Sequence, residues 1–294
     1  MIGIIPAAGA GQRIQPLGCS KELLPVGSRM VNGVERPKAV SEYLVERMIA
    51  AGATQICMII SGEKTDVVKY YAERDHPSAI TDRGAEIFYV VQQKPLGLCD
   101  ALFRAAGFAR HHEQVLIGLP DTIWFPENAY LSALDFSRTS VNLVLFPVAD
   151  PSAFDAVVCD ELGYVEQVQV KQEGPGSHWV WGAVTTTGEC FYRLKVLWEA
   201  RGRVDEYLGN LLNAFLAAGN VVGGQHCGEV YMDVGTLQGY RLAQDFLRAH
   251  QDPSASLRIS PVDSDARKTA QDPSASLPRQ AGAGRISPVG SRSA

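Results

Sequence analysis

The sequence predicts an α/β protein with a doubly wound, mainly parallel sheet of mixed pairing, followed by a disordered C-terminal tail. Three observations support this fold class. Short apolar runs alternate with helix-length segments over roughly the first 120 residues, a glycine-rich turn directly follows the first run, and the composition changes after residue 250. The chain has 294 residues and is 46% hydrophobic, which suits one large α/β domain with a substantial core.

The first half of the chain alternates expected strands with expected helices. Apolar runs predict buried strands at Ile2–Ile5 and Gln55–Ile60, and a third and a fourth strand at Ile87–Val91 and Gln114–Leu119. Helical periodicity predicts helices over Pro37–Gly52, Lys64–Ala72 and Leu98–Ala109. Such units form right-handed crossovers, and their ligands bind beyond the carboxyl ends of the strands. If the first strand lies beside the fourth, as in the common order, the glycine-rich turn meets Pro120 and Asp121.

The second half of the chain is expected to complete the domain. Val141–Val148 has the composition of a strand, and Gly163–Val168 begins a hairpin-like segment. Val204–Ala218 is amphipathic and predicts a helix that ends at Gly219. A last helix should run from Leu237 to about His250, with Thr236 as its N-terminal cap.

The composition divides the chain into a domain of residues 1–250 and a tail of residues 251–294. The tail is rich in Ser, Pro, Ala, Gly and Arg, and it repeats the short sequences QDPSASL and RISPV. Few apolar residues are available there for burial, so we expect the tail to be disordered. No function is assigned to it.

Charge and cysteine usage exclude several classes of function. The net charge of −5 predicts no basic face, so a nucleic acid polymer is not an expected partner. No apolar run approaches the roughly 20 residues of a membrane span, so no membrane partner is expected. The six cysteines are scattered without a CxxC pair, which is typical of reduced thiols and predicts a cytoplasmic location.

The stretch after the first strand has the residues of a polyanion site. Pro6–Gly11 (PAAGAG) is a turn of small residues whose amides can point inward and hold phosphate oxygens. Arg13 can grip phosphate through two donors, and Lys21 is a mobile point charge. A glycine-rich loop alone is a weak signal, so these residues are equally compatible with an ordinary turn and two solvated charges.

Asp121 follows the fourth strand and should face the glycine-rich loop. A carboxylate opposite a phosphate is costly unless a cation lies between them, so Asp121 is a candidate ligand for Mg²⁺, which prefers oxygen. The alternative is that Asp121 caps the next turn, and for this residue alone that interpretation is favoured.

The longer string Ile2–Val26 resembles the signature of the sugar-1-phosphate nucleotidylyltransferases, which are the nucleoside-diphosphate-sugar pyrophosphorylases. Their pattern is roughly A-G-G-x-G-T-R-L-x-P, a spacer, and P-K-x-L-L-P-V. The matching residues are Ala8, Gly9, Gly11, Arg13, Pro16, Lys21, Leu23, Leu24, Pro25 and Val26. Gln12 stands where the family has Thr, which normally helps to hold phosphate, and Ser20 stands where it has Pro. The resemblance implies a Rossmann-like nucleotidyltransferase fold.

Two further segments are similar to the nucleotide side of that family. LPDTIWF looks like L-G-D-N-I-F, whose Asp binds Mg²⁺ and matches Asp121. VVQQKPLGLCDAL looks like Q-x-x-P-x-G-L-A-x-A-L, which reads the base. The match implies that Gln92 hydrogen-bonds a pyrimidine and that Gly97 lets the base lie against the backbone; a solvent-facing loop is the alternative for Gln92. Asp100 stands where the family often has His or Gln.

The sugar side resembles the family less closely. The segment from Gly163 is similar to G-x-V-x-x-I-x-E-K-P, which makes Lys171 the lysine that contacts the sugar phosphate. Val170 occupies the place of the glutamate that hydrogen-bonds sugar hydroxyls. Asp155 and Ala156 fall near the family's sugar-contacting glycine. The alternative is that Lys171 is a surface lysine of a hairpin and does not contact a substrate.

The segment GEVYMDVGTLQGY is similar to W-x-D-I-G-T-P-x-x-Y, which makes Asp233 the second metal carboxylate. The resemblance therefore implies that Arg13, Lys21 and Lys171 are catalytic cations and that Asp121 and Asp233 hold Mg²⁺ as the cofactor. The implied nucleotide-binding residues are Ala8, Gly9, Gly11, Gln12, Gln92 and Gly97, and the implied sugar-phosphate residues are Asp155, Ala156 and Lys171.

The implied reaction transfers a nucleoside monophosphate from dTTP or UTP to a sugar 1-phosphate, with glucose 1-phosphate the commonest acceptor, and releases pyrophosphate. The partners are then small molecules. Two alternatives stay open: a cytidylyltransferase with another phosphate acceptor, and a non-catalytic nucleotide- or sugar-nucleotide-binding protein of the same fold. The choice of base, the sugar and the oligomeric state are not determined by the sequence, although relatives often form dimers or tetramers.

Overall fold

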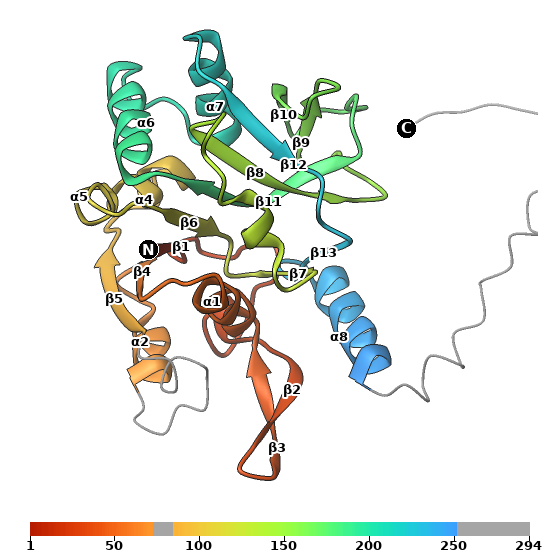
Figure 1. The fold of residues 1–294 in the computed structure, drawn as a ribbon. Helices are drawn as coiled ribbons and strands as arrows, with labels where there is room; N and C mark the ends of the chain where they lie inside the picture. The colour runs from red at the N-terminus through yellow and green to blue at the C-terminus, as the bar shows by residue number, and fades with distance from the viewer. Residues whose placement is uncertain (73–84, 252–294) are drawn as a thin grey trace, which may run out of the picture.

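The computed structural model describes residues 1–72 and 85–251, with α8 (Leu237–Gln251) as its last element. Within these residues a nine-stranded sheet has the order β10-β9-β11-β6-β1-β4-β5, and β8 joins β11 to β12 off this path (Figure 1). The tail predicted to be disordered lies outside the described residues apart from Gln251. The division at residue 250 therefore stays a proposal.

The parallel half of the sheet follows the predicted strands. It consists of β1 (Ile2–Pro6), β4 (Gln55–Ile60), β5 (Glu86–Val91) and β6 (Val115–Gly118). The first strand lies between β4 and β6, with Ile4 opposite Cys57 on one side and Ile117 on the other. The expected neighbourhood of the first and fourth strands is confirmed, so the loops after both open at the same edge.

The other half of the sheet contains the antiparallel pairs. Its strands are β8 (Val141–Pro147), β9 (Asp155–Cys159), β10 (Val165–Val170), β11 (Trp179–Thr186) and β12 (Val222–Gln225). β11 pairs antiparallel with both β6 and β8 and so joins the two halves. Within this nine-stranded sheet, as far as the structure describes it, only β10 and β11 run against the common direction. The predicted mainly parallel sheet with mixed pairing is confirmed.

Helices cover both faces of the sheet, as the doubly wound prediction requires (Figure 1). On one face lie α4 (Leu98–Phe103), α5 (Ala106–Ala109), α6 (Gly188–Ala200) and α7 (Leu208–Ala217), which share a core with Ile2 and Ile4. On the other lie α1 (Val40–Ala50), α2 (Thr65–Ala72) and the 3-10 turn η2 (Ala129–Ala133), which pack around Ile5. Alternate residues of β1 therefore face opposite cores.

Three expected helices differ in their bounds, and one helix was not predicted. Pro37 does not open a helix: it lies in β3 (Val34–Ala39), which forms a hairpin with β2 (Pro25–Val31). The turn between them is Asn32-Gly33, whose φ angles of 49° and 78° suit a tight hairpin turn. The expected helix 98–109 is divided into α4 and α5, the helix expected over 204–218 begins only at Leu208, and α6 fills a segment for which no helix was expected.

A third small core holds the C-terminal helix against the sheet. β13 (Val230–Asp233) pairs antiparallel with β7 (Thr122–Phe125), so Asp233 lies opposite Thr122. α8 follows at once and buries Ala243 and Leu247 in this core. The predicted cap is confirmed, because the Gly239 amide donates to Thr236 Oγ1 at 3.0 Å. In the described part of the chain, no helix is both long and apolar enough to cross a bilayer.

Candidate active site

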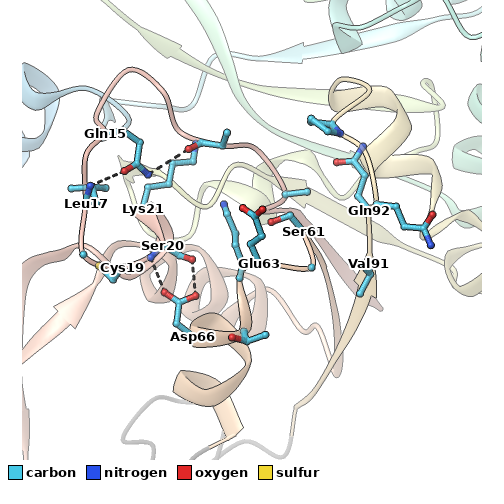
Figure 2. Close-up of a pocket in the computed structure, with 18 residues that line it drawn as sticks. Gln15, Leu17, Cys19, Ser20, Lys21, Ser61, Glu63, Asp66, Val91 and Gln92 are labelled. Atoms are coloured by element: carbon cyan, nitrogen blue, oxygen red, sulfur yellow. Dashed lines mark hydrogen bonds between the residues drawn. The ribbon is translucent and has the colours of Figure 1, made fainter.

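Two neighbouring cavities open at the carboxyl edge of β1 and β6, and Lys21 lines both. The first, which we call the loop cavity, has a volume of about 770 Å³ and lies among residues 8–21, 61–66 and 91–95. The second, the carboxylate cavity, has about 480 Å³ and includes Asp121, Asp155 and Asp233. Figure 2 shows the loop cavity with Lys21 and Ser20 on one side and Val91 and Gln92 on the other.

The glycine-rich loop separates the two cavities. Ala8 is buried and lines the loop cavity, whereas Gly9 lines the carboxylate cavity. Gly11 has a φ of +66°, and a Cβ there would lie 2.9 Å from Lys21 Cδ, so glycine lets Lys21 pass beneath the loop. Gln12 is exposed and lines neither of these two cavities. Its role in holding phosphate stays a prediction.

A buried lysine that was not predicted as a site residue holds this loop in place. Lys64 Nζ donates to the Ala7 carbonyl at 2.6 Å, to the Gly9 carbonyl at 2.8 Å and to Glu22 Oε1 at 2.7 Å. These bonds use all three ammonium protons. Two loop carbonyls are thus hydrogen-bonded to one ammonium group, and this holds the conformation of the loop. Nothing in the spacing of Lys64 from the loop indicates this contact.

Each predicted metal carboxylate is paired with a predicted catalytic cation. Lys21, in the short 3-10 turn η1 (Lys21–Leu23), places Nζ 2.5 Å from Asp121 Oδ2, and Arg13 NH1 lies 2.9 Å from Asp233 Oδ2. Burial by itself would raise the pKa of Asp121, but the adjacent Lys21 ammonium outweighs this and holds that pKa below its usual value. Burial likewise opposes the charge on Lys21, yet Asp121 raises the pKa of the ammonium. Both groups are therefore charged at neutral pH.

The two carboxylates converge on Gly235. A Cβ on that glycine would lie 2.8 Å from Asp233 Oδ1, 2.9 Å from Asp121 Oδ2 and 2.9 Å from an Arg13 nitrogen. The described residues contain no group of three or more His, Cys, Asp or Glu side chains that could hold a metal. Two converging carboxylates do fit Mg²⁺, which is typically bound by one or two carboxylates and completed by substrate phosphates and water.

The far wall of the carboxylate cavity is aromatic and carries Asp155 and Lys171. Trp181, Tyr207 and Tyr231 line this cavity, and Lys171 Nζ lies 4.1 Å from the centre of the Tyr207 ring. Asp155 accepts a hydrogen bond of 3.3 Å from Trp181 Nε1. The β9–β10 register places Asp155 directly opposite Val170, so both side chains are on the same face of the hairpin.

Ala156 does not share this position. Its side chain is fully buried, and it does not line the carboxylate cavity. The alternation of β9 explains the difference, because successive residues of a strand point to opposite faces. The structure therefore brings Asp155 and Lys171 to one cavity and leaves Ala156 in the core behind them.

Gln92 and Gly97 lie beyond the carboxyl end of β5. Gln92 is 4% exposed, lines the loop cavity and donates from Nε2 to Asp100 Oδ2 at 2.6 Å. Gly97 has a φ of +96°, and a Cβ there would come within 3.1 Å of the Glu206 backbone. Glycine is thus required for packing at this position. That it also admits a base stays a prediction.

Comparison with known proteins agrees with this geometry. The family model described as Nucleotidyl transferase matches residues 2–250. The chain is 28% identical over 257 residues to glucose-1-phosphate thymidylyltransferase of Mycolicibacterium smegmatis, covering 84% of this chain and 82% of that protein. It is 27% identical over 170 residues to UTP–glucose-1-phosphate uridylyltransferase of Mycoplasma genitalium, covering 52% of this chain and 55% of that protein.

Solved structures share the fold. UDP-glucose pyrophosphorylase from Acinetobacter baumannii superimposes with a TM-score of 0.71 at 18% identity, over 88% of this chain and 99% of that one. The family match extends from the first strand to the last described helix, and so includes both carboxylates, both cations and the glycine-rich loop. The chain therefore belongs to the nucleotidyl transferase family.

Proposed function

We propose that the protein transfers a nucleoside monophosphate from a nucleoside triphosphate to a sugar 1-phosphate and releases pyrophosphate. One observation carries this proposal: Asp121–Lys21 and Asp233–Arg13 meet beside the glycine-rich loop, at the junction of two cavities. The loop cavity has room for a nucleoside, and the carboxylate cavity for a sugar phosphate. The reacting phosphates would then meet at Lys21.

The reaction needs no protein nucleophile. An oxygen of the sugar phosphate is already an anion, and it attacks the α-phosphorus of the triphosphate. A new oxygen–phosphorus bond forms as the bond to the β-phosphate oxygen breaks, and the bonding electrons leave with pyrophosphate. The protein has to bring two polyanions together and offset their charge.

Three cations are available for this task. Lys21 lies between the cavities and would contact the α-phosphate, while Arg13, which is exposed, would bind the departing β- and γ-phosphates. Lys171, at the far side of the carboxylate cavity, would hold the incoming sugar phosphate. Each would neutralise charge that the substrates carry into the site.

The two carboxylates are the groups that would bind a divalent cation. Asp121 and Asp233 would hold Mg²⁺ by their oxygens, and the bound ion would supply a positive charge to the phosphates. Without such an ion the two carboxylates would repel the triphosphate. In the free protein Lys21 and Arg13 neutralise the two carboxylates. When Mg²⁺ takes over that role, both cations would be released to contact the substrates.

The sugar pocket supports a polyol acceptor. The half-buried Asp155 carboxylate accepts a long hydrogen bond from Trp181, and it can accept further hydrogen bonds from hydroxyl groups. It lies opposite Val170, so a carboxylate is present one strand away from the place where the resemblance implies one. The relatives named for glucose 1-phosphate make it the first acceptor to test, with dTTP or UTP as donor.

The direct test measures pyrophosphate release from glucose 1-phosphate and Mg²⁺ with dTTP, UTP, CTP, ATP and GTP in separate reactions. We expect release with dTTP or UTP, and loss of at least about a hundredfold in Lys21→Ala and in Asp233→Asn. Both variants should keep the circular dichroism spectrum of the unchanged protein.

Other outcomes would redirect the proposal. Release with CTP alone, or only with another phosphate acceptor, would favour the cytidylyltransferase alternative. Binding of a nucleotide sugar with no release from any triphosphate would favour a binding protein. Full activity in both variants would contradict the assigned site.

A further inference from the structure

The residue that Gln92 contacts, Asp100, stands where the resembling family often has His or Gln. Asp100 lies on α4, is 9% exposed and accepts the 2.6 Å hydrogen bond from Gln92 Nε2. Arg104, one turn further along, donates from Nε to the same carboxylate oxygen at 3.0 Å. The three side chains form a chain from the helix to the loop cavity, which Gln92 lines.

The Asp100 carboxylate determines how the Gln92 amide is turned. A carboxylate paired with arginine is ionised and can only accept hydrogen bonds, so Gln92 must direct its NH2 group towards it. The Gln92 backbone is also held, because its amide donates to the Ile60 carbonyl at 2.8 Å. Because the NH2 group of Gln92 is bound to Asp100, the carbonyl oxygen is the part of this amide that is left to contact a ligand. Among the described residues nothing donates to that oxygen, and it is not sealed from solvent.

We propose that Asp100 is a positioning residue for base selection: with Arg104 it fixes the Gln92 amide, so that Gln92 presents its carbonyl oxygen to a base with a ring N–H. Uracil and thymine have such an N–H at N3, and guanine has one at N1. Cytosine and adenine have a lone pair at the corresponding nitrogen. An acceptor facing an acceptor leaves both unpaired, which is the kind of mismatch that proteins reject strongly.

This inference rests on the proposed function, since it concerns the nucleotide of that reaction. A bare i,i+4 ion pair would be unremarkable, because Lys195–Glu199 on α6 is of the same kind and lines neither of the two cavities. What distinguishes Asp100–Arg104 is the third bond, which leaves the helix and reaches the cavity wall. Glu199 therefore provides a matched control.

The test compares Asp100→Asn with Glu199→Gln. Asparagine has the shape of aspartate but can donate or accept, so it permits both orientations of the Gln92 amide. We expect kcat/KM for UTP or dTTP, divided by kcat/KM for CTP, to fall at least about tenfold in Asp100→Asn. The KM for the sugar phosphate should not change, and Glu199→Gln should keep the original ratio. An unchanged ratio in folded Asp100→Asn would overturn the inference.

Binding measured by calorimetry, with each triphosphate and Mg²⁺ but no sugar phosphate, separates this inference from the proposed function. Preference for UTP, dTTP or GTP that weakens in Asp100→Asn supports the inference even without turnover. Preference of the unchanged protein for CTP or ATP overturns it while leaving nucleotidyl transfer in place, and binding of no triphosphate overturns both. If Asp100→Asn does not fold, the double variant Asp100→Ala, Arg104→Gln removes the same acceptor, and it should show the same loss of selectivity.

Discussion

At the scale of single residues, the site depends on charges that neutralise one another until substrates arrive. Lys21 and Arg13 hold the two carboxylates, and Lys64 holds both Glu22 and two carbonyls of the glycine-rich loop. Lys64 and Glu22 are almost fully buried, so their pairing is worth more than a surface ion pair. The removal of either member of such a pair should therefore affect both stability and substrate binding.

Lys64→Met should leave Glu22 buried without a cation and destabilise the protein by about 3–5 kcal/mol. The double variant Lys64→Met, Glu22→Gln removes that uncompensated charge and should recover part of the stability. Neither variant has a donor for the Ala7 and Gly9 carbonyls, so we expect the KM for the nucleotide to be raised in Lys64→Met and to remain raised in the double variant. Thermal unfolding and steady-state kinetics measure the two effects. Recovery of both together would show that Lys64 has only a structural role.

Gly235→Ala should abolish turnover with little effect on the fold. The added methyl group would lie within 3.0 Å of Asp121, Asp233 and Arg13, and the two carboxylates would have to separate. Because the groups around the added methyl are the metal carboxylates and a cation, the loss should appear in kcat and in the Mg²⁺ concentration needed for half-maximal rate. Gly107→Ala, where no atom lies within 4 Å of the added Cβ and which lines neither cavity, is the matched control. Equal Mg²⁺ dependence in both variants would contradict the assignment.

Binding of the sugar phosphate should depend on pH through Asp155. Burial raises the pKa of Asp155 above its usual value of 3.8, and Trp181 and Lys171 oppose this only in part. The folded protein therefore binds this proton more tightly than the unfolded chain, and the ionised form, which accepts from sugar hydroxyls, is lost as pH falls through the raised pKa. The pKa of Asp121 is lowered, so Asp121 stays ionised in the same range.

We expect the KM for the sugar phosphate to rise on acidification towards that raised pKa. The phosphate of the substrate titrates too, so the informative quantity is the ratio of KM between the unchanged protein and Asp155→Asn at each pH. Asparagine cannot be ionised, so the ratio should change with pH around the raised pKa of Asp155 and become constant at higher pH, where Asp155 is fully ionised. A ratio that does not vary with pH would exclude this role for Asp155.

At the scale of elements, the site depends on a pairing that is remote in sequence. β13 returns from the end of the domain to pair with β7, and this places Asp233 beside Asp121. α8 then fixes β13 from outside through Ala243 and Leu247. The β2–β3 hairpin projects away from the sheet (Figure 1), yet its first residue, Pro25, accepts hydrogen bonds from Tyr240 and Gln244 of α8. The stability of α8 is therefore coupled to the metal carboxylate.

Thr236→Ala should destabilise the protein by about 1 kcal/mol, because it removes the bond from the Gly239 amide that starts α8. Thr236→Ser keeps the hydroxyl and should recover most of that loss. Urea unfolding measures both. A loss of the same size in the serine variant would mean that the methyl group, rather than the cap, stabilises the end of β13.

At the scale of the whole molecule, we expect residues 1–250 to form one domain that contains both cavities, with the repeated sequence after it as a separate tail. A chain ending at residue 251 should have the same melting temperature and the same turnover as the full chain, because every residue assigned to the site lies before that point. Thermal unfolding and pyrophosphate release test this. A lower melting temperature would show that the tail packs against the domain, and would contradict the division at residue 250.

Local sequence was sufficient for much of the fold. Consecutive apolar residues determined β1, β4 and β6, since a fully buried strand needs side chains that are apolar on both faces. An apolar run also found β5, although this strand ends the sheet order and is only half-buried. Periodicity found α2 and α8, with the cap at Thr236. It misplaced the start of α1, because Pro37 is acceptable both at a helix start and in the outer strand of a hairpin. Only the pairing with Ser28 decides between them.

What the sequence by itself determined is the set of chemical groups: a glycine-rich turn, cations, and carboxylates at the ends of strands. Tertiary structure decided which of them meet. Lys21 and Asp121 are 100 residues apart, and Arg13 and Asp233 are 220 apart, so no local pattern can pair them. Lys64 was missed for the same reason, because the loop carbonyls that it binds are 55 and 57 residues away. The hydrogen bond that Gln92 donates to Asp100 spans only 8 residues, but the motif alone does not indicate it. Sheet order and the cross-strand register bring these groups together, and both depend on contacts distributed over the whole core.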